Sequence, residues 1–217
     1  LSVIENQNMI ESLFLDDKTH ELQQKVNDKL VEVGKKYATE YDIHVETMVA
    51  KGRVYEKIIE VAEMVNADLI VMGTNGAPKR VMKKVIGTNA ERVVRLAHCP
   101  VITIKGKDHK KGCDNIILPL DLENRTKEKV TLAIEYARYW GATIRVVSVL
   151  LKDKKEIKDK LVRNLNQVKK FISDANLECS AELLKGEKGK SLVSCILDYE
   201  KKFESDLILI MTRQEDV

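Results

Sequence analysis

The sequence predicts an α/β protein made of two tandem repeats, each an open parallel sheet with helices on both faces. Three observations lead to this fold class. Segments typical of strands alternate with segments of helical periodicity along most of the 217 residues. The apolar pattern of the first half recurs in the second half. The composition is that of a globular protein, with 44% hydrophobic and 33% charged residues.

The second half gives the clearest series of elements. Residues 115–120 form a continuous apolar run, which is typical of a strand buried on both faces. A helix is expected next over Thr126–Trp140, with apolar side chains on one face and Gly141 at its end. The expected elements then continue as strand, helix, strand, helix and strand over residues 143–150, 155–171, 179–184, 191–203 and 207–211.

The first half repeats this pattern from a later starting point. Apolar residues mark one face of an expected helix, and the same spacings recur 135 positions later. The two sets are Leu22, Val26, Leu30, Val33 and Tyr37, and Ile157, Leu161, Leu165, Val168 and Ile172. The run Asp68-Leu69-Ile70 likewise corresponds to Asp206-Leu207-Ile208. We interpret the pattern as an internal duplication, with repeats over residues 1–105 and 114–217 and a linker over 106–113.

Both repeats are expected to be incomplete. The first begins at the end of its second strand, so its opening strand and helix are missing from the sequence. The second lacks a closing helix and strand. The chain also opens on Leu1-Ser2-Val3-Ile4 without an initiator Met, so we expect a portion of a longer chain.

Composition and charge argue against several classes of protein. The net charge of +3 is far from the strong basic excess of a dedicated nucleic-acid binder. No apolar run approaches the roughly 20 residues that span a bilayer, and no signal peptide is recognisable. The four cysteines contain no CxxC pair, and no histidine pattern suits zinc. We expect a cytoplasmic protein without a metal site, and without nucleic acid or membrane as a partner.

The strongest local motif follows the strand expected at residues 69–72. Met72-Gly73-Thr74-Asn75-Gly76 leads out of that strand, and Gly87-Thr88-Asn89 precedes a helix expected at residues 90–96. Glycines let a backbone approach a ligand closely, and the first N–H groups of a helix attract anions. Ligands of open parallel sheets bind at the carboxyl ends of the strands. The motif therefore predicts a phosphate site.

These residues also carry a resemblance to a known family. A strand ending in Met-Gly-x-x-Gly, a later Gly-Thr motif and a strand after Cys99-Pro100-Val101 resemble the universal stress protein family. The resemblance covers nearly the whole chain as two repeats. It implies a five-stranded domain of the adenine nucleotide α-hydrolase type in each repeat, and a regulatory role in the stress response. It also implies contact between the two repeats, a homo-oligomer and a further protein partner.

One subset of this family binds ATP, and the resemblance implies such a site in the first repeat, with or without Mg²⁺. The implied binding residues are Val3, Met72, Gly73, Gly76, Gly87, Thr88 and Asn89. The backbone near the glycines would hold the phosphates, Thr88 would donate its hydroxyl, and Met72 and Val3 would flank the adenine or ribose. Slow hydrolysis is the most that is implied, and no catalytic residue is expected.

The second repeat departs from the ATP-binding pattern. It has Asp121 after its first strand. The resemblance implies that an Asp at this position holds the adenine side of the nucleotide. A structural role for Asp121 is equally open. The segment that corresponds to the first glycine motif reads Ile210-Met211-Thr212-Arg213-Gln214, so both glycines are replaced. We expect the second repeat not to hold a triphosphate.

A structural explanation of the Gly87-Thr88 motif also stays open. Thr88 and Glu91 have the spacing of a capping box, which would account for both residues without a ligand. Glu91 would also oppose a phosphate, whereas the basic residues of 79–84 would attract one. The alternative function is a protein-interaction module of the same fold that binds no nucleotide. A second glycine-rich segment, at residues 186–191, resembles a P-loop but has Leu184 where the first glycine should be.

Overall fold

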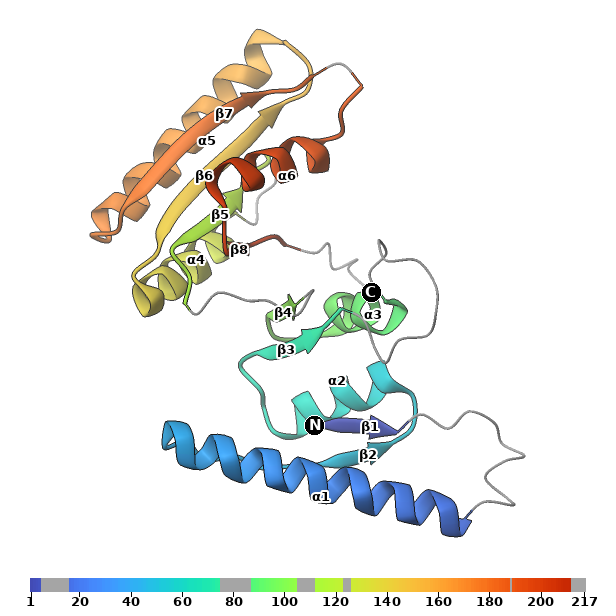
Figure 1. The fold of residues 1–217 in the computed structure, drawn as a ribbon. Helices are drawn as coiled ribbons and strands as arrows, with labels where there is room; N and C mark the ends of the chain where they lie inside the picture. Colours follow the sequence, from blue (N-terminus) through green and yellow to red (C-terminus); the bar gives the residue numbers. More distant parts are fainter. Residues whose placement is uncertain (5–15, 75–86, 105–111, 123–125, 188, 212–217) are drawn as a thin grey trace. The chain divides into compact units, whose positions relative to one another are not determined.

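The computed structural model describes residues 1–4, 16–74, 87–104, 112–122, 126–187 and 189–211 (Figure 1). They form two compact units, one from the residues up to Ile104 and one from the residues between Gly112 and Met211. Both units combine parallel strands with helices, so the predicted α/β class is confirmed. Among the described residues, no helix has both the length and the apolar character that a bilayer crossing requires.

The second unit contains a four-stranded parallel sheet. Its strands are β5 (Asn115–Pro119), β6 (Thr143–Leu150), β7 (Cys179–Lys185) and β8 (Leu207–Ile208). The order in the sheet is β7-β6-β5-β8, so β5 has a neighbour on each side. Ile116 pairs with Ile144 of β6 and with Leu207 of β8. The continuous apolar sequence of β5 is thus explained by its central place.

Helices cover both faces of this sheet. They are α4 (Thr126–Trp140), α5 (Lys155–Asp174) and α6 (Leu192–Phe203) (Figure 1). Because side chains alternate along a strand, Ile116 and Leu118 pack with α4 and α5 while Ile117 packs with α6. All three β5 side chains are fully buried. The expected strand at residues 207–211 is shorter than predicted, since β8 contains only Leu207 and Ile208.

The first unit contains two separate two-stranded parallel sheets among its described residues. One pairs β1 (Ser2–Ile4) with β2 (Val49–Lys51), and the other pairs β3 (Ile70–Gly73) with β4 (Val101–Ile104). Its helices are α1 (Asp16–Tyr41), α2 (Val54–Met64) and α3 (Thr88–Leu96). Figure 1 shows α1 and α2 on opposite sides of the β1–β2 pair.

The predicted internal repeat would account for the two small sheets of the first unit. By sequence correspondence, β1, β2 and β3 take the places of β6, β7 and β8. In the second unit β5 lies between β6 and β8 and joins them into one sheet. No strand among the described residues of the first unit has that place. The first unit therefore differs there from the five-stranded domain that the resemblance implies. Its apolar core instead joins α2, β3, α3 and β4 around Val93, which is fully buried.

Candidate functional site

Thr74 connects three elements at the carboxyl end of β3. Its backbone N–H donates to the carbonyl of Ile104, the last residue of β4, at 3.0 Å. Its own carbonyl accepts from the N–H of Gly87, directly before α3, at 3.0 Å. The two strand ends and the start of α3 are thereby held together. This is the edge at which the glycine motif predicts a ligand.

Gly87 is required by a close approach of two backbone segments. A Cβ atom at this position would lie 2.8 Å from the carbonyl oxygen of Thr74, which is closer than real Cβ contacts allow. The backbone angles of Gly87 are ordinary, with φ −65° and ψ 144°. The glycine is therefore explained by space and not by backbone strain. Any side chain here would push α3 away from the end of β3.

The start of α3 differs from the capping box suggested by the sequence. Gly87, not Thr88, is the N-cap residue, and no side chain caps the helix. Thr88 is exposed at the first helical position, and the N–H of Glu91 bonds to the carbonyl of Gly87 at 3.0 Å. The capping-box interpretation of Thr88 is therefore wrong. Among the residues that the structure describes, no side chain caps the first turn of α3.

The charge of Glu91 is partly offset by its own helix. Its carboxylate lies 3.8 Å from the guanidinium of Arg95, one turn further along α3. Both side chains are more than half exposed, so water screens this pair and its energy is small. Glu91 remains a source of negative charge near the helix start, although the positive charge of Arg95 offsets part of its electrostatic effect.

The structure brings only some of the predicted site residues together. Four of them lie near the hydrogen bonds that join Thr74 to Ile104 and Gly87. They are Gly73, Gly87, Thr88 and Asn89. Met72 is half-buried in the apolar core between α2 and α3. Val3 belongs to the other small sheet, where it pairs with Ala50. Gly76 lies outside the described residues, as do the basic residues at positions 79–84.

At the corresponding edge of the second unit, three consecutive backbone carbonyls receive hydrogen bonds from side chains. Lys129 Nζ donates to the carbonyl of Pro119 at 2.7 Å. Ser148 Oγ donates to Leu120 at 3.0 Å, and Asn164 Nδ2 donates to Asp121 at 3.0 Å. The donors come from α4, β6 and α5. The end of β5 is thus fixed by protein groups, and the Asp121 backbone is part of that structure.

Lys129 is the residue at this edge that the sequence reasoning missed. It is only 7% exposed, which is unusual for a lysine. The signal was present in the helical spacing, since Lys129 stands four and eight positions before Ala133 and Ala137, which are both fully buried. A charged residue on the apolar face of a helix indicates a specific partner, and here that partner is a backbone carbonyl.

The segment that resembles a P-loop has a structural role. Two carboxylates surround the ammonium of Lys190, with Glu187 at 2.9 Å and Asp198 at 3.0 Å. Hydrogen bonds from Lys190 to Glu187 and then to Asp198 hold the pKa of this lysine above its usual range. Ser191 Oγ accepts the N–H of Ser194 and so caps α6. The lysine is therefore engaged by carboxylates, and the serine by the helix that it starts.

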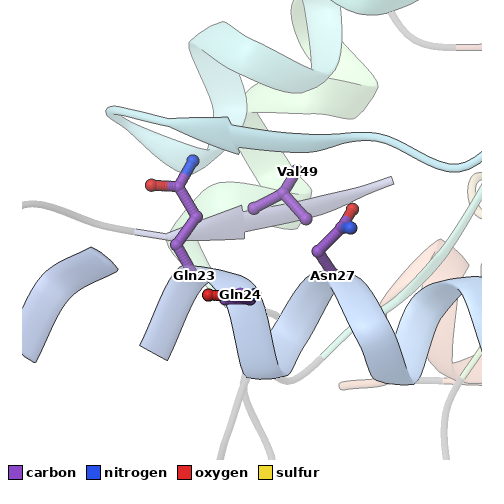
Figure 2. Close-up of a pocket in the computed structure, with 4 residues that line it drawn as sticks. All are labelled: Gln23, Gln24, Asn27 and Val49. Atoms are coloured by element: carbon purple, nitrogen blue, oxygen red, sulfur yellow. The ribbon is translucent and has the colours of Figure 1, made fainter. Parts of the chain in front are cut away.

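A hollow lies between α1 and β2. It has a volume of about 370 Å³ and is lined by Gln23, Gln24, Asn27 and Val49 (Figure 2). Figure 2 shows the amide-bearing side chains on α1 and Val49 on the facing strand. None of the predicted site residues lines it. Within the described part of the chain, no group of three or more His, Cys, Asp or Glu side chains is arranged to hold a metal ion.

Comparisons with known proteins agree with the motif. Residues 1–105 match the model of the universal stress protein family. A universal stress protein from Methanocaldococcus jannaschii is 38% identical over 86 residues, which are 39% of this chain and 49% of that protein. The first half of the chain belongs to the universal stress protein family. The chain matches only about half the length of this curated relative.

Solved structures extend the likeness in fold to the second half. A universal stress protein from Archaeoglobus fulgidus DSM 4304 aligns at a TM-score of 0.72, covering 95% of this chain and 72% of its own. The two are 20% identical, so this likeness shows the fold alone. Another from Archaeoglobus fulgidus, solved in complex with dAMP, is 24% identical and covers 44% of this chain and 78% of its own at a TM-score of 0.40. A likeness at that level does not extend the ligand to this chain.

Proposed function

We propose that the first unit binds an adenine nucleotide, ATP, at the carboxyl end of β3, and that the second unit does not. The observation that carries the proposal is the uncapped start of α3, held beside the end of β3 by the Gly87–Thr74 hydrogen bond. Membership of the first half in the universal stress protein family supports the choice of ligand. The chain would act as a stress-response regulator.

The helix start suits a phosphate for physical reasons. N–H groups in the first turn of a helix have no partner within the helix, and the helix dipole adds partial positive charge there. Residues 88–90 supply these groups in α3, and no side chain of the described residues caps them. Gly87 lets the start of α3 lie close to the end of β3, because it carries no side chain. Phosphate oxygens would take the place of the missing cap, with the Thr88 hydroxyl as a further donor.

The described residues of the second unit offer no comparable place. After β8 and Leu209 the chain has Ile210 and Met211, where the first unit has Met72 and Gly73. The carbonyls at the end of β5 already accept side-chain donors, and Lys129 lies buried among them. The second unit would therefore contribute through its surface. We propose it as the intramolecular partner of the nucleotide-binding unit.

The proposed mechanism is a change of surface and not a turnover of substrate. Neither the sequence motifs nor the described residues supply a nucleophile with its base. ATP at the start of α3 would alter the charge presented by this edge, and Mg²⁺ would offset part of it. A protein partner or a second copy of the chain would distinguish the loaded from the empty form.

The alternative is an interaction module that binds no nucleotide. One observation favours it, because contact with the Thr74 carbonyl explains Gly87 without any ligand. Calorimetric titration of the full chain with ATP, with and without Mg²⁺, separates the two functions. We expect one site per chain. No heat and no thermal shift at about 1 mM ATP would favour the interaction module.

A variant at Thr88 locates the site. Thr88→Glu adds a negative charge at the first helical position, where it should leave the folded state as stable or slightly more stable. The same charge should weaken ATP binding by about tenfold or more, because it stands where the phosphates would be. Thr88→Gln is the neutral control of equal size; it loses only the hydroxyl donor and should bind ATP more tightly than Thr88→Glu. Unchanged ATP affinity in Thr88→Glu would show that ATP does not bind at α3.

A further inference from the structure

An arginine of α3 lies against an aromatic ring of α2. The guanidinium carbon of Arg92 is 4.7 Å from the centre of the Tyr55 ring, over its face. A cation in this position is attracted by the electrons of the ring. Arg92 stands four residues after Thr88, the first residue of α3, and Tyr55 belongs to the first turn of α2. The contact therefore joins the first turns of two helices.

The ring of Tyr55 is held in place from two sides. It packs against the apolar core that includes the fully buried Val93 of α3. Its hydroxyl donates to Oε1 of Glu56 at 2.8 Å, and the same oxygen accepts from Nη1 of Arg53 at 3.0 Å. Because the core and this hydrogen bond fix the ring, they also give the guanidinium of Arg92 a defined place.

Arg92 differs from the neighbouring arginines in having no acidic partner. Arg53 is paired with Glu56, and the guanidinium of Arg95 lies 3.8 Å from Glu91. Within the part of the chain that the structure describes, Arg92 has the ring contact but neither a hydrogen bond nor an ion pair. A guanidinium carries five N–H donors in its plane, and contact with a ring face leaves them unused. Arg92 is exposed, so these donors are accessible to a ligand.

Both helices of this contact begin at the carboxyl ends of strands. The N–H of Gly52, two residues before α2, donates to the carbonyl of Ile4, the last residue of β1, at 3.1 Å. The start of α3 is joined to the end of β3 through Thr74. A long side chain on a helix points back over the preceding turn, which for Arg92 is the turn that begins at Thr88. Arg92 thus belongs to the edge at which we propose the nucleotide.

We propose that Arg92 binds a phosphate of the nucleotide, and that Tyr55 is the positioning residue that holds its guanidinium at the start of α3. This inference rests on the proposed function. The planar fork of an arginine matches phosphate oxygens with two parallel N–H···O bonds. A guanidinium already held on a ring loses less freedom when the phosphate binds. Its charge also opposes the negative charge that Glu91 places near the helix start.

Calorimetric titration of the full chain with ATP and with AMP tests the role of Arg92. Arg92→Gln should weaken ATP binding by about tenfold or more. AMP binding should weaken less, because the arginine faces less phosphate charge in AMP. Arg163→Gln removes the same charge from an exposed position on α5 in the second unit, and should leave ATP affinity within about twofold of the parent. Thermal unfolding without nucleotide should show that both variants keep the stability of the parent.

Variants of Tyr55 test the positioning role. Tyr55→Phe keeps the ring and should retain most of the ATP affinity. Tyr55→Leu removes the ring face and should weaken ATP binding by about threefold or more in the parent, but not further in Arg92→Gln. An equal loss from Tyr55→Leu in both backgrounds would contradict the positioning role.

Two results would overturn the role of Arg92 itself. They are equal ATP affinity in Arg92→Gln and the parent, and equal losses for ATP and AMP. If the parent binds ATP and either result is found, this inference fails while the proposed function stands. A parent that binds no ATP would refute both.

Discussion

Lys129 donates a hydrogen bond of 2.7 Å from its ammonium to the backbone carbonyl of Pro119, at the end of β5. The lysine is 7% exposed, so the bond is made largely out of water. It fixes the last residue of the central strand to the first turns of α4. With the bonds from Ser148 and Asn164, it makes the end of β5 a rigid point of the second unit.

Lys129→Met should therefore destabilise the chain by about 1–3 kcal/mol, because it leaves a buried carbonyl without its donor. Methionine nearly fills the same volume, so the loss reports the polar contacts of the ammonium and not a cavity. The measurement is urea unfolding of the full chain. Lys158→Met, on the exposed side of α5, is the control and should change stability little. Equal stability of Lys129→Met and the parent would contradict this role of the bond.

Gly87→Ala should destabilise the first unit by about 1–3 kcal/mol, since overpacking forces the backbone apart. The added Cβ would meet the Thr74 carbonyl at 2.8 Å and push α3 from the end of β3. Thermal unfolding and hydrogen exchange of residues 88–96 are the measurements. Thr88→Ala changes an exposed neighbour and should stay within about 0.5 kcal/mol of the parent. If both variants unfold alike, the close approach at Gly87 is not needed for stability.

The pH dependence of stability should show a contribution from Tyr199. Burial, and then the hydrogen bond to Glu182 at 2.7 Å, raise the pKa of Tyr199 above its ordinary value of 10.0. The folded state holds this proton more tightly than the unfolded state. The resulting stability is complete below pH 10 and is lost as the pH rises toward the folded pKa. As the pH rises above 10, the free energy of unfolding should fall less in Tyr199→Phe than in the parent. Parallel curves for the two proteins would refute this contribution.

Cys179 should react slowly with thiol reagents in the folded chain. Burial raises the pKa of its thiol from 9.0 to about 11, which the nearby Lys169 only partly opposes. At pH 8 the thiolate fraction is then about a hundredfold lower than at the ordinary pKa. Alkylation with iodoacetamide, located by mass spectrometry, should modify Cys179 much more slowly in the folded chain than in urea. Equal rates in the two conditions would show that the thiol is not held in this environment.

The sequence predicts much of the second unit residue by residue. The apolar run of β5, the helix α4 from Thr126 to Trp140 and the strand β6 from Thr143 to Leu150 are confirmed. These elements have strong periodicity and clear ends, such as Gly141 after α4. In β8 the predicted strand extends beyond Ile208, because apolar composition does not show where pairing with β5 stops.

The candidate site is harder to predict because local patterns have more than one structural outcome. Thr88-x-x-Glu91 has the spacing of a capping box, yet Gly87 occupies the cap position since its backbone must reach Thr74. That contact joins residues 13 positions apart, so no local pattern encodes it. Lys129 illustrates the same limit, because its partner Pro119 lies on another element.

Photolabelling with 8-azido-ATP, followed by mass spectrometry of the labelled peptides, tests the central claim most directly. The account predicts that label appears on the first unit, on peptides containing residues 72–74, because the azide sits on the adenine ring and Met72 is expected beside the adenine, and that excess ATP prevents it. Peptides of the second unit, including Asp121, should stay unlabelled. Label on the second unit, or label on the first unit that excess ATP does not prevent, would contradict the account.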